Sequence, residues 1–433
     1  MIENTESRRR TSLPAAFPDT VCGKREKTGM EPSKKRAVRL FVLVLVCVAV
    51  ADGLGAKIFS NYFNEVYHID SVQRGFLEIP RESPGILCMV LVAALGFLGN
   101  LWMSVIAQIL MLVGLVVMGC FSPGYGVMLA FLFLHSLGQH LFMPLNDSIS
   151  MELAEKGKVG TGLGRFKGVT TLTSMVSACI VFVGFRRGFF TFERKVILPF
   201  VIAALATALA GVLLAAMVRE MGKTGAVSNH KLLFRRRYMP YYMVTLAYGC
   251  QKRIRIVFAP WVIIQLLGQG ADTVALLTIV THLVGSWMAP RIGKLLDRLG
   301  VKKMLWMEAA YIAVTFSVMG LMAGLLADGA FAAGGWQTWL VFGAYVLCVL
   351  FEQFSMVHSY MMRSIALDPS EVTRTLSVGL SVDHVMAIIA SPIMGLVWEG
   401  WGVQYVFYLA ALSALLQVAA AAMTGSGRKT ATA

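Results

Sequence analysis

The sequence carries little charge for its length. Only 15% of its 433 residues are Asp, Glu, Lys or Arg, whereas a typical soluble domain carries about 25%. Hydrophobic residues make up 57% of the chain. These proportions exclude an ordinary soluble globular protein.

Motifs for metal binding and catalysis are also missing. The seven cysteines show no CxxC spacing, and six of them lie in apolar segments, which favours small buried hydrophobic residues over a disulfide or metal framework. The sequence has no phosphate-binding loop, no zinc-ligand spacing and no nucleophile elbow. We therefore expect no ATP hydrolysis, no enzymatic catalysis, no cofactor and no metal.

The hydrophobic residues are gathered in twelve segments, each near the ~20 residues that cross a bilayer. The segments are 37–63, 75–98, 101–121, 126–149, 160–185, 196–218, 238–267, 272–290, 304–326, 337–361, 375–397 and 402–423. They predict an all-α membrane protein of twelve transmembrane helices. We expect two six-helix bundles, at 37–218 and 238–424, joined by a cytoplasmic linker at 219–237.

The formal net charge of +15 is not spread evenly and does not indicate a nucleic-acid partner. Most Lys and Arg lie in the tail 1–36, the linker and the loop 291–303, all on one side of the predicted topology. Short basic loops stay cytoplasmic, so both termini are predicted inside. One loop disagrees, because Arg186, Arg187, Arg194 and Lys195 fall on the outer side. We expect the tail 1–36 to be disordered and 425–433 to be a second cytoplasmic tail. No small-residue cleavage site follows the first apolar run, so we expect no cleaved signal peptide, and Met30 is a second candidate start.

Charged residues inside the apolar segments occur in segments 1, 2, 7, 10 and 11. Segments 3, 6 and 12 have none between their ends, and segment 9 has only Glu308. The acids are Asp52, Glu78, Glu82, Glu352 and Asp383, and the bases are Lys57, Arg81, Lys252, Arg253 and Arg255. Burying charge in lipid costs at least ~2.5 kcal/mol per group, so these residues face a wet cavity or a partner. Charged helices that line a central path are typical of a transporter.

One loop carries a motif. Residues 293–303 resemble the cytoplasmic loop signature G-x-L-x-D-R-x-G-x-[RK]-[RK] of the major facilitator superfamily, through Gly293, Asp297, Arg298 and Gly300. Gly300 permits a tight turn, and Asp297 can cap a helix start or pair with a base of the neighbouring bundle. A weaker copy at 96–100 has Asn100 in place of the acid, which makes a gating role less secure there.

The resemblance to this superfamily covers residues 37–424 and rests on the number of helices, the basic central linker and the loop motif. The stretch 74–85 is also similar to poorly characterised bacterial members of the superfamily. The resemblance implies two bundles, each an inverted pair of three-helix units, that close around a site at the membrane midplane. Helices 1, 4, 7 and 10 would be central, and 3, 6, 9 and 12 peripheral. Segment 4 lacks the arginine of the drug–proton antiporter motif L-x-x-x-R-x-x-Q-G, and segment 5 lacks the proline of G-x-x-x-G-P-x-x-G-G. Efflux of cationic drugs is therefore less favoured.

Segment 7 carries a stripe of polar side chains on one helical face. Its members are Tyr241, Tyr248, Gln251, Lys252 and Arg255. One interpretation is a substrate site for an anion or polyol, to which Arg81 would contribute. The alternative is internal pairing with the carboxylates of segments 1, 10 or 11. Arg253 points about 100° away and is expected to pair with a neighbouring helix or to reach the interface.

Glu78, Arg81 and Glu82 share a face of segment 2. They form either a triad whose charges satisfy one another or a gate for substrate or protons at the outer mouth.

Three acids at mid-depth are candidates for proton coupling. They are Asp52, Glu352 and Asp383, of which Asp383 is favoured because His384 beside it can hold a proton and Pro392 permits a bend. An isolated acid in a low dielectric exchanges protons near neutral pH, whereas a salt-bridged acid has a structural role. His135 and His140 lie on different helical faces, which is poor metal-ligand geometry.

These observations predict a secondary transporter in the bacterial cytoplasmic membrane, acting as a monomer with a small-molecule substrate. The cargo would be small and polar, anionic or polyhydroxy, and its movement by alternating access would be coupled to protons. Five interior acids balance five interior bases, so cavity charge does not fix the sign of the substrate. Efflux of drug-like or metabolite substrates is the alternative within this fold. A non-transporting membrane sensor is the alternative from another class.

Overall fold

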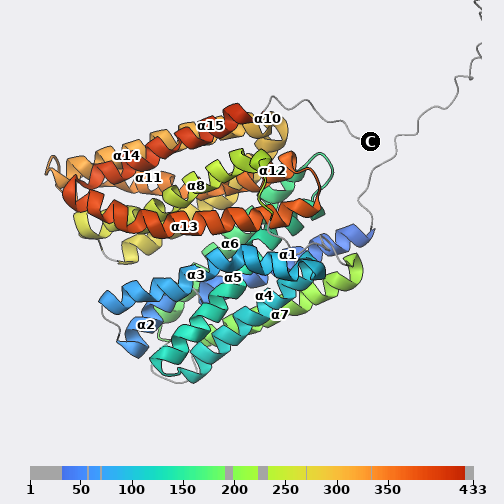
Figure 1. Cartoon of the computed structure of the whole chain (residues 1–433). Helices are drawn as coiled ribbons and strands as arrows, with labels where there is room; N and C mark the ends of the chain where they lie inside the picture. Colours follow the sequence, from blue (N-terminus) through green and yellow to red (C-terminus); the bar gives the residue numbers. More distant parts are fainter. Residues whose placement is uncertain are drawn as a thin grey trace, which may run out of the picture.

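The computed structural model describes residues 32–55, 58–68, 71–190, 198–222, 233–269, 271–332 and 334–424. The regular secondary structure of these residues is helical, as predicted. The helices form two groups that follow the sequence, α1–α7 and α8–α15 (Figure 1). We call them the first and the second helix group.

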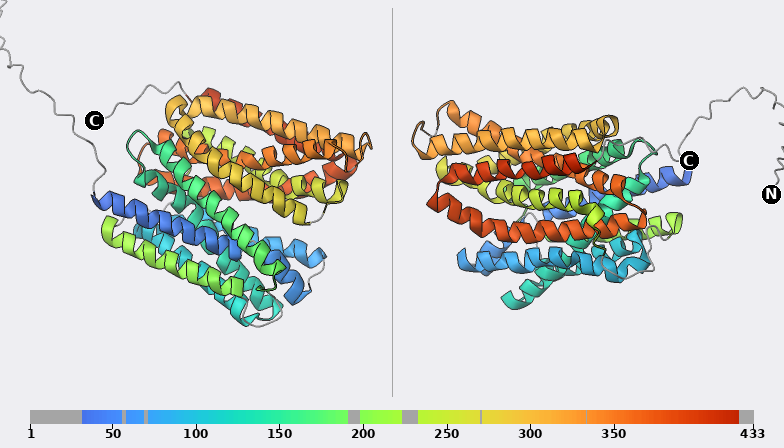
Figure 2. Two further views of the ribbon diagram at one scale, coloured as in Figure 1. Left: turned by 180° about the vertical axis from the view of Figure 1, so that it is seen from behind. Right: turned by 45° about the horizontal axis from the view of Figure 1, so that its top comes forward.

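The first helix group contains seven α-helices. They are α1 (Pro32–Leu54), α2 (Phe59–Tyr67), α3 (Ser71–Leu95), α4 (Asn100–Val116), α5 (Tyr125–Leu153), α6 (Val159–Arg186) and α7 (Leu198–Met221). A short 3₁₀ helix, η2 (Gly96–Leu98), follows α3, and a π-helical segment, η3 (Val117–Phe121), extends α4. Viewed from behind, α1 and α7 lie side by side (Figure 2).

The second helix group begins with the 3₁₀ turn η4 (Arg236–Tyr238) and is less regular. Its α-helices are α8 (Met239–Arg253), α9 (Ala259–Trp261), α10 (Ala271–Ala327), α11 (Gln337–Leu350), α12 (Ser355–Ile365), α13 (Ser370–Gly400), α14 (Val403–Ser413) and α15 (Leu415–Met423). Two π-helical segments, η5 (Ile254–Phe258) and η6 (Val262–Leu266), continue α8 on either side of Pro260. The 3₁₀ segment η7 (Phe351–Phe354) joins α11 to α12.

Within the described residues, ten helices are long and apolar enough to cross a membrane. One of them, α10, has 57 residues and is two helices merged across Gly300, whose φ of 76° and ψ of 168° are not helical. The turn predicted at Gly300 is therefore present, because glycine adopts positive φ without a steric penalty. The helical stretch from α8 to η6 is not among the ten.

The first predicted helix differs from the observed one. It begins at Pro32 rather than at residue 37, so part of the tail predicted to be disordered is helical. It ends at Leu54, and α2 follows as a separate helix. Gly53 and Gly55 flank this end, and glycine is a poor helix former. Residues 1–31 and 425–433 lie outside the described residues, as do Lys57, Arg194, Lys195 and most of the linker.

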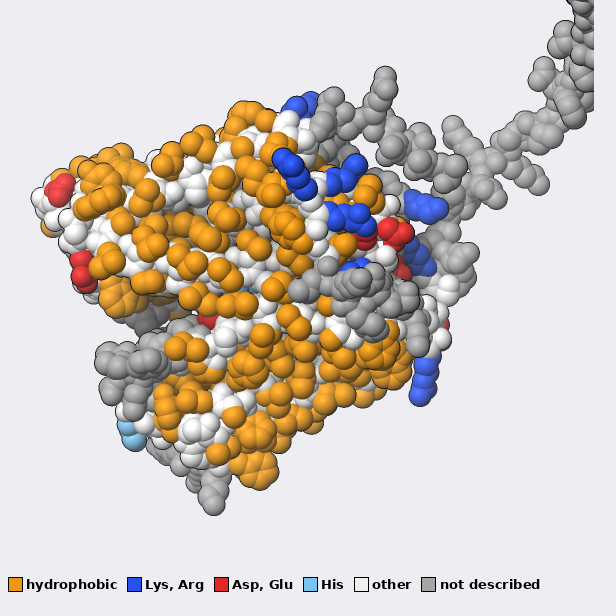
Figure 3. Space-filling model, viewed as in Figure 1, with side chains coloured by type: hydrophobic (Ala, Val, Ile, Leu, Met, Phe, Trp, Pro, Cys, Tyr) orange, Lys and Arg blue, Asp and Glu red, His pale blue; other side chains and the backbone are white. Residues whose placement is uncertain are grey.

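The two ends of the helices differ in charge. Lys and Arg gather at the end where α1 begins and α15 stops, whereas hydrophobic side chains cover the sides (Figure 3). We call this end the terminal end and the opposite one the distal end. At the distal end, the surface is notched between the two helix groups (Figure 3). The apolar sides fit a lipid environment, in which exposed hydrophobic residues carry no penalty.

The two groups pack most closely where α6 of the first meets α10 of the second. Gly160 and Gly164 of α6 face Gly293 and Ala289 of α10, and small residues let two helix backbones approach. A Cβ atom added to Gly293 would lie 2.1 Å from the Gly160 carbonyl oxygen. Glycine at position 293 is thus required by the packing of the two groups as well as by the loop motif.

Replacing Gly293 tests this contact. We expect Gly293→Ala to lower the melting temperature of the purified protein, because overpacking against backbone costs about 1–3 kcal/mol. Gly343→Ala in α11 is the matched control, since a Cβ atom there meets nothing within 4 Å. Alanine favours helix over glycine by about 1 kcal/mol, so the control should be neutral or stabilising. Equal melting temperatures for the two variants would contradict the close approach.

Candidate functional site between the two helix groups

The helix α3 lies between α5 of its own group and α13 of the other group. Its sequence contains Pro80 and Pro84, which lack the N–H groups that would continue the helical ladder. Neighbouring helices supply side-chain donors to this stretch: Ser136 donates to the Arg81 carbonyl. From the second group, Ser381 donates to the Gly85 carbonyl at 3.1 Å. The hydroxyl groups of Ser136 and Ser381 thus tie α3 to both helix groups.

Glu82, one turn before Gly85, contacts the second helix group. Its Oε2 lies 2.9 Å from Nδ1 of His384 on α13 and 3.9 Å from the Arg253 guanidinium on α8. A Cβ atom on Gly85 would lie 2.4 Å from the His384 ring, so glycine there lets the imidazole reach α3. Arg253 pairs with other helices, as predicted. Glu82 thus pairs with the second helix group and not within the triad predicted for α3. The Glu78 side chain lies outside the described part.

Asp383, next to His384, forms an ion pair with Lys252 of α8. The Asp383 side chain is only 6% exposed, and its Oδ1 has no hydrogen-bond partner among the described residues. Gly249 allows the close approach, because a Cβ atom there would lie 2.6 Å from the Asp383 carbonyl oxygen. Asp383 is therefore a salt-bridged carboxylate with one unsatisfied oxygen, rather than the isolated acid considered from the sequence.

Glu352, in η7, also has cationic partners. One oxygen lies 3.2 Å from Lys167 of α6, and the other lies 3.0 Å from Arg255. The Glu352 side chain is 39% exposed, the most open of these acids, whereas Arg255 is buried. Arg255 stands in the π-helical segment η5, and such segments are frequent at functional sites. Lys167 and Glu352 belong to different helix groups, so this pair also bridges them.

Asp52 of α1 lies at a small polar cavity inside the first helix group. The Gln139 amide donates to its Oδ1 at 3.2 Å. The cavity has a volume of about 70 Å³ and is lined by Asp52, Phe59, Arg81, Leu132, His135, Ser136 and Gln139. A space of this size holds a few water molecules at most.

Tyr248 and Gln251, two other residues of the predicted stripe, contact their own helix group. Tyr248 packs on the rings of Phe351 and His358, with centroid distances of 5.4 and 5.1 Å. Gln251 donates to Ser413 at 2.8 Å, toward the last two helices. Tyr248 and Gln251 thus hold α8 within its own group, while Lys252 and Arg255 reach the charged residues. The spacing of these residues along α8 could not show which of them pack within the group and which contact the charged residues.

The histidines have separate surroundings. His135 lies 3.2 Å from the Met111 carbonyl, whereas His140 lies 2.8 Å from the Ser136 carbonyl within its own helix. The predicted separation of these two side chains is confirmed. In the second group, His358 lies 2.7 Å from the fully buried Glu308, which gives the charge of segment 9 a partner.

At the terminal end, the loop motif joins the two groups. Asp297 accepts hydrogen bonds from the backbone N–H groups of Gly160 at 2.7 Å and Thr161 at 2.6 Å. These are the first N–H groups of α6, which have no partner within the helix, and a carboxylate is favourable at that position. The capping role proposed for Asp297 is therefore present, across the groups. Arg298 is exposed.

Sequence reasoning missed an equivalent contact at the weaker motif copy. The Thr373 hydroxyl of α13 donates to Oδ1 of Asn100 at 3.1 Å, and Thr373 also bonds Ser148 at 2.7 Å. Asp147 was missed as well: its carboxylate accepts from Ser359 of the second group. Asp147 and Lys167 lie near the ends of predicted segments, so the pattern did not mark them as interior. The position of Asn100 in the weaker motif copy was the only feature of the sequence that could have indicated its contact.

The larger cavity lies away from these charges. It has a volume of about 540 Å³ and is lined mainly by apolar residues of α1, α6 and α10. The Trp287 and Pro290 side chains of α10 form one wall, and Val38 and Val42 of α1 form another. Its lining includes neither Glu82 nor Glu352 nor Asp383, so we place the candidate site in the charged layer between the groups.

Solved structures resemble this one. FucP in its outward conformation, described as a major facilitator superfamily transporter, matches with a TM-score of 0.68 and 15% identity over 91% of this chain and 100% of that one. A second structure of FucP is described as that of the E. coli fucose:proton symporter. The chain has the major facilitator superfamily fold. A bacterial homologue of the iron transporter ferroportin, in the outward-facing state, matches with a TM-score of 0.68 and 12% identity over 90% and 99% of the two chains.

The proton:xylose symporter XylE has the same superfamily fold, with a TM-score of 0.63 and 11% identity over 89% and 94% of the two chains. No family model and no curated protein sequence matches the chain. At these identities, the comparisons establish the fold and leave the substrate open.

The pair between Lys252 and Asp383 gives a direct test of the site. We expect Lys252→Met and Asp383→Asn each to lower the melting temperature by several degrees, because each leaves one buried charge without its partner. The double variant should lose less than the sum of the two. Lys158 and Glu155, an exposed pair 2.9 Å apart, serve as the control and should show no coupling. Additive losses at Lys252 and Asp383 would rule out the pair.

Proposed function

We propose that this chain is a secondary active transporter that moves a small polar solute across the membrane by alternating access. The observation that carries the proposal is the charged layer between the two helix groups. Glu82 contacts His384 and Arg253, and Glu352 contacts Lys167, in each case across the groups. Buried charges within a membrane protein mark solute and ion pathways. Ion pairs that join two separately packed groups can exchange partners as the groups move.

The proposal includes twelve membrane crossings in two six-helix bundles. Division of α10 at Gly300 and inclusion of the stretch from α8 to η6 bring the ten apolar helices to twelve. We place both termini in the bacterial cytoplasm, because the basic residues gather at the terminal end. The contacts of Asp297 and Asn100 then close the cytoplasmic side, and the notch at the distal end opens outward (Figure 3). The chain would act as a monomer.

The substrate would bind between Lys252, Arg255 and Arg81, supported by Tyr248 and Gln251 behind them. Each of the first two cations already has a carboxylate partner, Asp383 or Glu352. A solute with hydroxyl groups can bond to both members of such a pair without breaking the charge balance. An anionic solute would have to replace a carboxylate at the cation. Polyhydroxy and anionic compounds are therefore the substrate classes that this arrangement supports.

Proton coupling would operate at Asp383. Its Oδ1 is buried and has no hydrogen-bond partner among the described residues, so Lys252 is the main partner that stabilises the charge of the carboxylate. Movement of α8 away from α13 would leave the acid in a low dielectric, where it takes up a proton. His384 lies beside it, with Nε2 3.9 Å from the Asp383 carboxylate. Glu352 and Asp52 are the further coupling candidates.

Efflux by the same fold is the alternative, and it differs only in the direction of the gradient that drives it. A non-transporting sensor is the alternative from another class. A sensor needs one ligand-dependent contact, whereas the described residues hold at least two ion pairs between the groups. Those pairs favour a moving carrier.

The cations of α8 should differ in importance. With a substrate found by thermal-shift screening of metabolites, we expect Lys252→Ala and Arg255→Ala to abolish uptake into proteoliposomes. Arg253→Ala should retain part of the uptake, because Arg253 pairs at the side of α3 and α13. Melting temperatures and gel filtration control for folding. Normal uptake by the first two variants would contradict the binding site, and misfolding of both would favour a structural role for the pairs.

The proposed coupling role of Asp383 can be tested by measuring two transport activities of one variant. We expect Asp383→Asn to lose accumulation driven by a pH gradient and to keep exchange of labelled for unlabelled substrate. The physical reason is that asparagine preserves the shape of the side chain but cannot carry a proton. Counterflow in proteoliposomes, with and without an imposed pH gradient, measures both activities. Accumulation by Asp383→Asn, or wild-type accumulation that ignores the pH gradient, would contradict proton coupling at this residue.

A further inference from the structure

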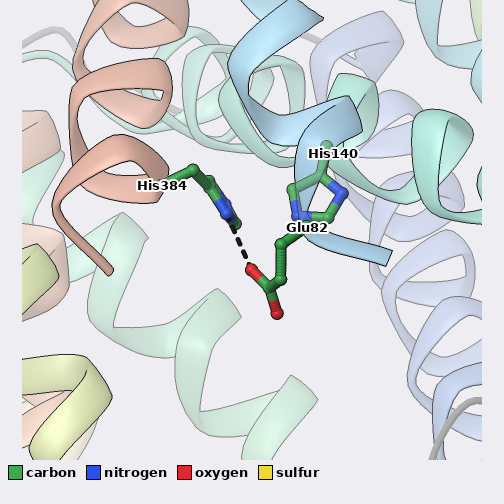
Figure 4. A group of neighbouring side chains, drawn as sticks. All are labelled: Glu82, His140 and His384. Carbon is green, nitrogen blue, oxygen red and sulfur yellow. Dashed lines mark hydrogen bonds and ion pairs between the residues drawn. The ribbon is translucent and has the colours of Figure 1, made fainter. Parts of the chain in front are cut away.

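Three potential metal ligands meet at the contact between the helix groups. Glu82 comes from α3, His140 from α5 and His384 from α13 (Figure 4). One ligand atom of each lies within 4.8 Å of the other two. The two imidazoles meet edge to face, with ring centroids 4.4 Å apart, and both histidines are buried. The Glu82 carboxylate faces the His384 ring (Figure 4).

The hydrogen bonds leave ligand capacity at this cluster. His140 Nδ1 lies 2.8 Å from the Ser136 carbonyl, which accepts a hydrogen bond and so holds the proton on Nδ1. The lone pair of the neutral ring is then on Nε2, the arrangement that metal-binding histidines adopt when the other nitrogen donates to a carbonyl. His384 presents Nδ1 to Glu82 at 2.9 Å, and its Nε2, 3.9 Å from the Asp383 carboxylate, is buried without a hydrogen-bond partner among the described residues. A buried polar atom of this kind requires an explanation, such as an ion or water.

We infer that Glu82, His140 and His384 form a binding site for a divalent transition-metal ion that bridges the two helix groups. Two imidazoles and a carboxylate suit zinc and the neighbouring late first-row ions. Ligand atoms around such an ion are about 3.3 Å apart at bond lengths near 2.0–2.1 Å. The cluster reaches that spacing by side-chain rotation, since its atoms already lie within 4.8 Å. A fourth position remains for water or a solute.

The surrounding charges set a limit on affinity. Lys252 and Arg253 of α8 lie nearby, and Asp383 balances Lys252. An ion at the cluster displaces the loose contact of 3.9 Å between Arg253 and Glu82. Arg253 keeps its bond from Nε to the Ala387 carbonyl at 3.2 Å. With one carboxylate and neighbouring cations, we expect affinity on the order of micromolar, weaker than that of closed structural zinc sites.

The site has a consequence for movement. Glu82 and His140 belong to the first helix group and His384 to the second, so a bound ion holds the groups in the described arrangement. Under the proposed function, the ion would slow transport, and that consequence rests on the proposed function. Binding itself does not, because it requires only the three side chains in place.

Zinc titration of purified, chelator-treated protein tests the site. We expect the wild type to bind one Zn²⁺ in this affinity range, measured by calorimetry and by competition with a fluorescent zinc indicator. Glu82→Gln, His140→Gln and His384→Gln should each weaken binding at least tenfold, because each removes a direct ligand. His282→Gln is the matched control: His282 is a helical histidine bonded to the Thr278 carbonyl at 2.8 Å, outside the cluster.

Three outcomes would overturn the inference. They are no Zn²⁺ binding by folded wild-type protein, wild-type affinity in all three cluster variants, and equal losses in His282→Gln and His384→Gln. Melting temperatures without zinc identify any variant that fails to fold. If Glu82→Gln fails to fold, Glu82→Asp replaces it, because aspartate keeps the carboxylate on a shorter side chain. Because binding is measured without transport, its failure leaves the proposed transport standing, and loss of transport leaves the metal site standing.

Discussion

The cost of burying charge in an apolar environment is the constraint on which this structure depends. A charged side chain within the membrane needs an opposite charge or water, since lipid offers neither. Here several of the partners come from the other helix group: Glu82 pairs with His384, and Lys167 with Glu352. The association of the groups is therefore linked to the charge state of the site. Under the proposed function, a change in protonation or a bound solute would alter the contacts that hold the groups together.

The contacts between the groups are of two kinds, at different depths. The terminal end is joined by polar and backbone contacts, in which Asp297 caps α6 and Asn100 bonds Thr373 of α13. Closer to the middle, the contacts are ion pairs whose exposure differs, from 15% for the Glu82 side chain to 39% for that of Glu352. Under the proposed function, the first kind would close the cytoplasmic end, and the second would respond to protons and solutes. Both kinds meet on α13, which carries Thr373 and His384.

The sequence was sufficient for the helical architecture and for the helices that carry charge, because hydropathy and the cost of buried charge act locally. It also predicted the turn at Gly300 and the capping role of Asp297, which a short motif encodes. The partners could not be predicted, because spacing along one helix does not say which neighbour it meets. Tyr248 and Gln251 therefore appeared equivalent to Lys252. Asp147, Lys167 and the contact of Asn100 with the second helix group were missed. Glu82 and His384 are 302 residues apart in the sequence.

Under the proposed function, the two helix groups move as bodies about the charged layer. Spin-label distances test this movement most directly: one pair at positions 156 and 302 of the terminal end, another at 121 and 401 of the distal end. Asp297→Ala removes two charge-assisted hydrogen bonds, each worth about 1.5–3 kcal/mol, from the closed end. We expect this variant to lengthen the terminal distance and to shorten the distal one, relative to the wild type. A terminal distance that lengthens while the distal distance stays constant or also lengthens would contradict it.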